Sequence, residues 1–246
     1  MRGMTPLFFL HGVSGNSTAW DRQVTHFTNL GYRCTAWNQP GYGGTPLVEP
    51  YTLENVVLQL KKQIGSQPAV LVGHSMGGLI AQEFYARYPQ SVAALALTFT
   101  SAAFVGGSDF SKQFVEQRMG PLDRGETMAQ IARHIMPAMS GRTADPAGRA
   151  LAERLMAALP PETYRKAVHL LTTFDRRADL PNIAVPALLI AGSDDTTAPA
   201  KIMGRMAEKI PGAEFALLEG CGHLGPMDQP DAFNAVLAGF LSGHKL

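Results

Sequence analysis

The chain has little of several features that would assign it to a special class of protein. Only 2 of its 246 residues are cysteine, and Cys34 and Cys221 lie far apart, which argues against a disulfide scaffold or a zinc site. The formal net charge is only +1, so we expect no nucleic acid and no anionic membrane as a partner. No apolar run approaches the roughly 18 residues that a membrane span needs.

We also expect no targeting segment in the amino-terminal region. Residues 1–6 are too few for a charged region followed by an apolar core, and the first apolar run leads directly into His11-Gly12. We therefore expect the protein in the cytoplasm. The hydrophobic content of 46% and the charged content of 17% suit a globular chain with a sizeable core. The sequence gives no indication of the oligomeric state.

Six short apolar runs have the length and composition of buried strands, and helical patterns separate several of them. This alternation predicts an α/β fold, in which a mostly parallel sheet is covered by helices on both faces and the functional loops lie at the carboxyl ends of the strands. The expected strands are Pro6–Leu10, Tyr32–Trp37, Ala69–Gly73, Val92–Phe99, Pro186–Ala191 and Glu214–Leu218. The expected helices are Thr52–Ile64, Gly78–Tyr88, Ile202–Ile210 and Asp231–Leu241.

The alternation stops between Phe104 and Asp179, where no strand-like run occurs. Four helical patterns take its place, and Gly120-Pro121, Ser140-Gly141 and Pro160-Pro161 punctuate them. We expect a helical cap of residues 104–179, inserted into a core formed by residues 1–103 and 180–246. The four patterns are Asp109–Met119, Glu126–Met139, Ala147–Leu159 and Glu162–Phe174.

The pentapeptide Gly73-His74-Ser75-Met76-Gly77 is the most informative motif in the chain. It follows a strand-like run and precedes a helical pattern, and a sharp strand-to-helix turn of this kind presents its central side chain at the top of the sheet. The small residues on either side allow the turn to close without a clash. The context therefore indicates that Ser75 is a nucleophile.

A serine hydroxyl needs a base, and that base needs a group to orient it. The loop after the fifth expected strand carries Asp194 and Asp195, and the loop after the sixth carries His223 among glycines. Both loops fall on the same edge of the sheet as Ser75. The spacing Gly192-x-x-Asp195-x-x-x-Pro199 favours Asp195 as the orienting group, while Asp194 is interpreted as a loop cap.

Ester cleavage through a serine also needs donors for the oxyanion. We expect one at the backbone N–H of Met76, directly after the nucleophile, and another at the N–H of Val13 in the loop after the first strand. His11 is interpreted as a brace of that loop, and His74 is expected to point away from the nucleophile.

Taken together, these motifs resemble the α/β-hydrolase superfamily over nearly the whole chain. The resemblance rests on His11-Gly12, Asn38–Gly43, Gly73–Gly78, the Gly192…Asp195…Pro199 loop and Gly222-His223. Within the superfamily the chain is most similar to 3-oxoadipate enol-lactonases and related small ester or lactone hydrolases. The resemblance implies a Ser75–His223–Asp195 triad that cleaves a small carboxylic ester or lactone through an acyl-enzyme, with no metal and no organic cofactor.

Several other activities share this fold. Haloalkane dehalogenases and epoxide hydrolases carry an aspartate at the nucleophile position, so Ser75 argues against both. A C–C bond hydrolase of ring-cleavage products and a cofactor-free perhydrolase would use the same triad and stay open. A non-catalytic small-molecule receptor on the same fold also stays open.

The expected cap should determine the choice of substrate. Its methionines suggest an adaptable apolar wall, although most of them are explained by packing of the cap on the core. A lactone acid would need a positive partner for its carboxylate, so Arg118, Arg133 and His134 are candidate substrate-binding residues. Trp20, which follows the loop of Val13, is a further candidate.

Overall fold

A computed structural model describes residues 4–104 and 107–246 of the chain. Residues 1–3 and 105–106, which fall within the expected core and the expected helical segment, lie outside the described residues. The strands form one sheet in the order β2-β1-β3-β4-β5-β6, with every neighbouring pair parallel, so the predicted parallel α/β architecture is confirmed. They are β1 (Leu7–Leu10), β2 (Cys34–Trp37), β3 (Ala69–His74), β4 (Val92–Thr98), β5 (Ala187–Gly192) and β6 (Glu214–Leu218).

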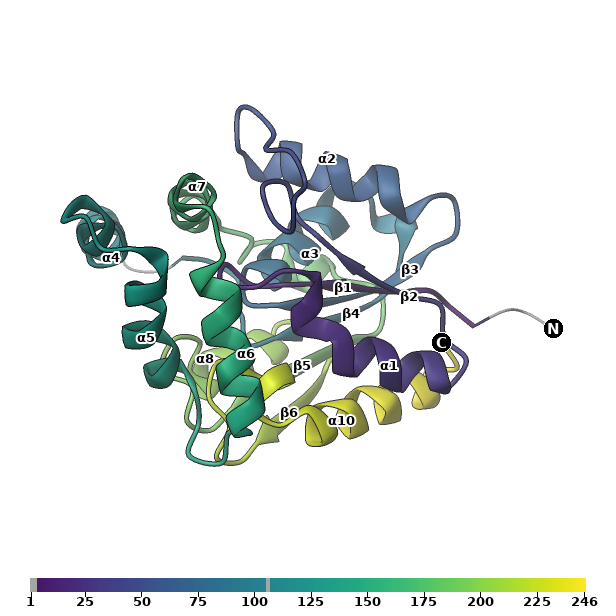
Figure 1. Cartoon of the computed structure of the whole chain (residues 1–246). Coiled ribbons are helices and arrows are strands. Elements are labelled where there is room, and N and C mark those ends of the chain that lie inside the picture. Colours follow the sequence, from purple (N-terminus) through teal and green to yellow (C-terminus); the bar gives the residue numbers. More distant parts are fainter. Residues whose placement is uncertain (1–3, 105–106) are drawn as a thin grey trace.

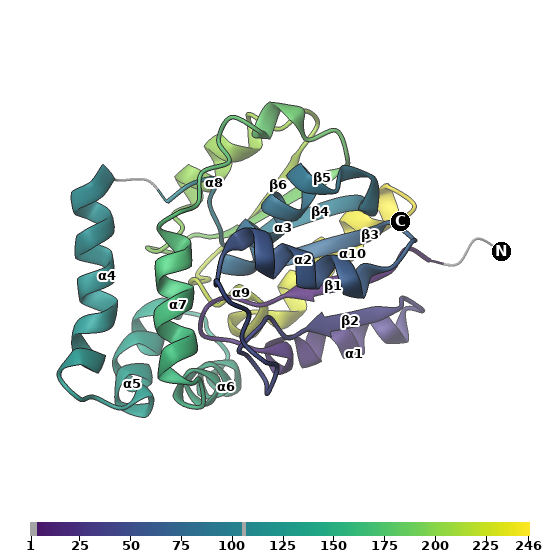
Figure 2. The same ribbon diagram turned by 90° about the horizontal axis from the view of Figure 1, so that it is seen from above.

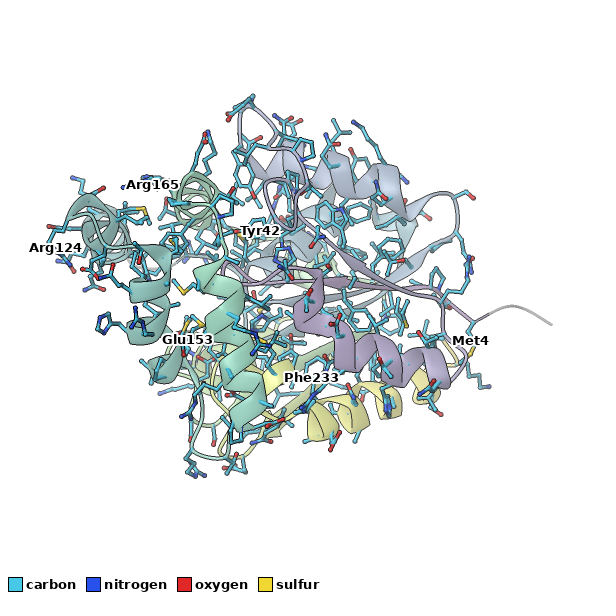
Figure 3. All side chains as sticks on the ribbon, viewed as in Figure 1. Met4, Tyr42, Arg124, Glu153, Arg165 and Phe233 are labelled. Atoms are coloured by element: carbon cyan, nitrogen blue, oxygen red, sulfur yellow. The ribbon has the colours of Figure 1, made fainter. Side chains whose placement is uncertain are left out.

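Helices cover both faces of this sheet (Figure 1). Alternate strand residues face opposite cores: Leu7 and Phe9 pack with α1 and α10, and Phe8 and Leu10 pack with α2, α3 and α8. Figure 3 shows Phe233 in the layer of α1 and α10. The helices of the two layers are α1 (Asp21–Asn29), α2 (Leu53–Ile64), α3 (Met76–Arg87), α8 (Ala200–Ala207) and α10 (Pro230–Gly243). The shorter elements are η1 (Ser17–Trp20), η2 (Pro89–Ser91), η3 (Leu180–Asn182) and α9 (Gly225–Asp228).

The helix boundaries follow local chemistry. The side chain of Thr52 accepts a hydrogen bond from the N–H of Asn55 and so caps α2, which begins one residue later than the sequence pattern suggested. Helix α3 begins at Met76, two residues before the expected Gly78, because the turn at Ser75 leads directly into it. Helix α1 was not predicted, since its sequence is mostly polar and Phe27 is the only large apolar side chain that it buries.

Between β4 and β5 the chain forms four helices, which we call the inserted helices: α4 (Gly107–Asp123), α5 (Met128–Met139), α6 (Pro146–Ala157) and α7 (Pro161–Leu171). The expected break at Gly120-Pro121 is wrong, because α4 continues through Pro121 into a last turn. The two ends of the segment meet, with the N–H of Phe104 bonded to the carbonyl of Phe174 at 2.9 Å and that of Arg176 to Ala102 at 2.7 Å. Figure 2 shows the inserted helices gathered at one end of the sheet.

No helix among the described residues combines the length and the apolar character needed to cross a bilayer.

Candidate active site

Ser75 occupies the turn between β3 and α3, with φ 53° and ψ −118°. This region is unfavourable for a residue with a side chain, and such strain is typical of functional turns. The turn closes because its neighbours are glycines: a Cβ atom on Gly77 would lie 2.0 Å from the carbonyl oxygen of Leu10, and one on Gly73 would lie 2.4 Å from that of Gly77. The requirement for small residues therefore has a steric basis at both positions.

Two hydrogen bonds connect Ser75, His223 and Asp195. The Nε2 atom of His223 lies 2.9 Å from the Ser75 Oγ, and its Nδ1 lies 2.8 Å from Oδ2 of Asp195. The other oxygen of Asp195 accepts the backbone N–H groups of Thr197 and Ala198 at 2.7 and 2.9 Å. Burial raises the pKa of the Asp195 carboxyl, but the charge and hydrogen bond of His223 and the two amides outweigh it, so this pKa lies below its usual value.

Asp194, the alternative carboxylate, has a different role. It forms an ion pair with Arg142 in the α5–α6 loop, and it also accepts the Arg142 N–H at 3.0 Å. The Ser193 hydroxyl donates to it at 3.1 Å. Asp194 thus tethers the loop after β5 to the inserted helices, and none of its hydrogen bonds or ion pairs with described residues involves the His223 side chain.

The loop that carries His223 is bonded to the same α5–α6 connection. The N–H of His223 donates to the carbonyl of Met139 at 2.7 Å. Asp228, which is 1% exposed, accepts the N–H of Gly222 at 3.2 Å and that of Gly141 at 2.9 Å through one oxygen. Asp228 was not singled out from the sequence, because its partners lie 6 and 87 residues away and no local pattern marks it.

Two backbone amides close to Ser75 in the chain or in space make no hydrogen bond within the described protein. A Cβ atom on Gly12 would lie 3.1 Å from that of Ser75, which places the loop after β1 against the nucleophile. Within the described part of the chain, neither the N–H of Val13 nor that of Met76 donates a hydrogen bond to the protein. Both are therefore available to an oxygen atom bound beside Ser75.

Two further histidines are buried near Ser75. Burial lowers the pKa of His11 to about 4 and that of His74 to about 3, so both are neutral near pH 7. His74 hydrogen-bonds through Nε2 to the carbonyl of His223 at 2.7 Å, and His11 bonds the loop at the carbonyl of Gly12. Cys221 is also buried, which raises the pKa of its thiol and keeps it protonated.

Two cavities open onto the Ser75–His223 pair. Cavity A, about 70 Å³, lies between the Val13 loop and the inserted helices. Cavity B, about 380 Å³, lies between the segment after β4 and the start of α8. Beside Ser75 and His223, the residues that line both cavities are Phe114, Arg118, Leu171 and Thr197.

The proposed substrate-binding residues fall in different environments. Arg118 on α4 lines both cavities. Arg133 and His134 are exposed on α5 and line neither, and the Arg133 guanidinium bonds the carbonyl of Ala129. Trp20 is 1% exposed, packs against Phe9 in the core and lines neither cavity. Tyr164, which lines cavity A, was missed because its helix gives only an ordinary amphipathic signal.

The described residues contain no group of three or more histidine, cysteine, aspartate or glutamate side chains arranged to hold a metal ion.

Comparisons with known proteins agree with this architecture. A family model described as the alpha/beta hydrolase family matches residues 7–236. The pimeloyl-[acyl-carrier protein] methyl ester esterase of Aromatoleum aromaticum is 29% identical over 243 residues, which cover 92% of this chain and 93% of that protein. The solved enol-lactonase of Burkholderia xenovorans LB400 is 26% identical with a TM-score of 0.83, over 98% of this chain and 94% of the other. A thermophilic esterase from Thermogutta terrifontis has a TM-score of 0.87 at 24% identity, over 98% and 91%.

Proposed function

Because the chain belongs to the alpha/beta hydrolase family, we propose that it is a serine hydrolase that cleaves a small carboxylic ester or lactone through an acyl-enzyme on Ser75. The observation that carries the proposal is the unbroken pair of hydrogen bonds, 2.9 and 2.8 Å long, from Ser75 through His223 to Asp195. The relatives include an esterase that is 29% identical and an enol-lactonase that is 26% identical, which favours ester and lactone substrates.

In the first half of the mechanism, the Ser75 Oγ attacks the substrate carbonyl while Nε2 of His223 accepts the hydroxyl proton. The negative charge that develops on the carbonyl oxygen is stabilised by the free amides of Val13 and Met76. Asp195 keeps the imidazole in the required orientation and stabilises its positive charge. His223 then gives the proton to the leaving alcohol oxygen as the C–O bond breaks.

In the second half, His223 accepts a proton from a water molecule as the water oxygen attacks the acyl carbon. Collapse of this second intermediate breaks the bond to Ser75 Oγ, which takes back the proton from His223. The products are the free acid and the alcohol, or a hydroxy acid when the substrate is a lactone. Ser75, His223, Val13 and Met76 line the two cavities, and Asp195 acts only through its hydrogen bond to His223.

We further propose that the inserted helices act as a cap that selects the substrate. They supply Phe114, Met136, Met139, Tyr164 and Leu171 to the cavity walls. Sites of this kind are mostly apolar with a few polar groups that set orientation. The core would then carry the reaction, and the inserted helices would choose the molecule that reaches it.

The proposal is tested by hydrolysis of a panel of short esters, lactones and enol-lactones in a pH-stat, with the Ser75→Ala variant beside the wild type. We expect turnover of at least one class, reduced at least about 10⁴-fold in the variant. Turnover that survives in Ser75→Ala would contradict the nucleophile assignment. Absence of any turnover would favour a C–C bond hydrolase, and tight ligand binding without turnover would favour a receptor.

A further inference from the structure

Arg118 is chemically isolated in the walls of the two cavities. Among the described residues that line cavity A or cavity B, it is the one with a permanent charge, since the others are apolar, hydroxyl-bearing or histidine. A cation in a largely apolar wall loses hydration unless something replaces it. The Arg118 guanidinium beside Ser75 and His223 therefore needs a negatively charged or hydrogen-bonding partner to replace its lost hydration.

The protein itself does not provide that partner. Three arginines of the inserted segment are paired with carboxylates, Arg124 with Glu126, Arg142 with Asp194 and Arg165 with Asp123. Apart from Arg118, the arginines without such a pair are exposed to solvent, namely Arg133, Arg149 and Arg154. Within the described chain, no carboxylate lies within ion-pair distance of Arg118, whose guanidinium instead lies 5.4 Å from the centre of the Phe114 ring. Stacking on an aromatic ring holds the planar group in place and leaves its N–H donors available.

A second polar group without a partner lies in the same wall. The hydroxyl of Tyr164, on α7, is buried, its O–H has no acceptor among the described residues, and the side chain lines cavity A. A buried hydroxyl is normally bonded, so an unpaired one at a cavity wall indicates a missing acceptor. Burial raises the pKa of Tyr164, while the charge of Arg118 and hydrogen bonding from its guanidinium oppose this, so the two groups are neighbours.

We propose that Arg118 and Tyr164 form a subsite for a carboxylate that the substrate carries in addition to its ester or lactone group. A guanidinium donates two parallel hydrogen bonds to a carboxylate, and a phenol hydroxyl donates a third. Since Tyr164 lines cavity A and not cavity B, the carboxylate lies in cavity A. This inference rests on the proposed hydrolase function and names its substrate class.

The size of cavity A further restricts the class of substrate. About 70 Å³ accommodates only a short chain between the reacting carbonyl and the carboxylate. The larger cavity B, about 380 Å³, would receive the alcohol part of an ester. The expected substrates are half-esters of short dicarboxylic acids, or lactones that carry a carboxylate, and not simple fatty esters.

The test compares monomethyl glutarate with methyl glutaramate, its uncharged amide of nearly the same shape. Binding of each is measured by isothermal titration calorimetry in the Ser75→Ala protein, so that no turnover is needed. We expect the acid to bind about 10- to 100-fold more tightly, as charge-assisted hydrogen bonds allow. Replacement of Arg118 by Gln should abolish this preference, and Tyr164→Phe should reduce it several-fold, about the effect of one hydrogen bond.

Arg124→Gln is the matched control. Arg124 is exposed just beyond α4 and lies at the outer side of the inserted helices in Figure 3. It should keep the full preference for the acid. Equal binding of the two esters, binding of neither, or a preference that survives Arg118→Gln would overturn the subsite.

Hydrolysis of methyl glutaramate by the protein with Ser75 intact is measured separately. Failure of that reaction would count against the hydrolase function, while the calorimetric preference reports on the subsite alone.

Discussion

The two sides of the cavities are held in place by different forces. On the sheet side, Ser75 is fixed by a turn without room for another atom, and Asp195 by two backbone amides. On the side of the inserted helices the wall consists largely of Met136, Met139 and other apolar side chains held by packing. Hydrogen bonds and a tight turn hold the reacting atoms in fixed positions, whereas packed methionine side chains can adapt to different ligands. The comparison separates a rigid reaction centre from an adjustable wall.

The loop between α5 and α6 does not fit this separation of reaction centre and wall. It belongs to the inserted segment by sequence, yet its Gly141 N–H donates to Asp228, and Met139, the last residue of α5 just before the loop, accepts the His223 N–H. The position of the base therefore depends on a segment of the inserted helices. A change in that loop should alter the reaction as well as the choice of substrate.

The largest expected effect separates the two neighbouring carboxylates of the β5 loop. Asp195→Asn should lower kcat about 10³- to 10⁴-fold, because the amide favours the wrong tautomer of His223. Asp194→Asn should leave kcat nearly unchanged, since Asp194 bonds Arg142 at the surface. Initial rates on the best ester of the panel measure both. A larger loss in Asp194→Asn would mean that the assignment of the two residues is reversed.

Glycine substitutions test how tightly the Ser75 turn is built. In Gly77→Ala the added methyl group would lie 2.0 Å from the Leu10 carbonyl, and we expect a loss of at least about 3 kcal/mol in the free energy of unfolding. Gly239→Ala, where no atom lies within 4 Å in the exposed part of α10, should gain about 0.5–1 kcal/mol. Urea denaturation measures both, and similar values for the two would refute the steric explanation.

Asp228 tests whether the α5–α6 loop is bonded to the reaction centre as described. Asp228→Ala leaves two buried amides without an acceptor, so the free energy of unfolding should fall by about 2–4 kcal/mol. Asp228→Asn keeps an acceptor oxygen and should lose only about 1 kcal/mol. Equal losses in chemical denaturation would show that space filling, and not the hydrogen bonds, is what matters there.

The buried histidines predict a loss of stability in acid. Their pKa values in the folded protein, about 4 for His11 and about 3 for His74, lie below the ordinary histidine value of 6.5 because both rings are buried. Below pH 6.5 the unfolded chain therefore binds protons that the folded chain does not. Each histidine should lower the free energy of unfolding by about 1.4 kcal/mol per pH unit, down to about pH 4 for His11 and about pH 3 for His74.

The histidine contribution is isolated by urea unfolding at pH 7.5 and pH 5.5 in the wild type and in His74→Gln. The variant should lose less stability between these two conditions, by about 1.4 kcal/mol. An unchanged difference would mean that His74 is protonated in the folded protein or that it stays neutral in both states.

The sequence predicted the sheet side of the site better than the wall. Ser75 and Asp195 follow the buried strands β3 and β5, while His223 follows the edge strand β6, which the sequence predicted as buried but which is largely exposed. Strands of a parallel sheet end at one edge, so the proximity of the three residues follows from order and spacing. The hydrogen bonds of Asp228 depend on where the inserted helices pack, which no periodicity in the chain encodes. Trp20 shows that nearness in sequence can also mislead. It follows the Val13 loop and was therefore a candidate for substrate binding, but its side chain packs in the core against Phe9.

The inserted helices illustrate the same point for charged residues. The candidates Arg118, Arg133 and His134 were equivalent in the sequence, and only the orientation of α4 and α5 distinguishes them. Arg118 faces the cavities, while Arg133 and His134 face solvent. The four inserted helices could be predicted from local pattern, but the face of each that meets the cavity is determined by contacts between elements.

The central claim is that Ser75 becomes acylated, and the most direct test is mass spectrometry of the protein quenched during turnover of an activated aryl ester. Peptide mapping should place the acyl group on the peptide that contains Ser75, and no adduct should form in Ser75→Ala. An adduct on another residue, or turnover with no adduct while Ser75→Ala stays active, would contradict the account.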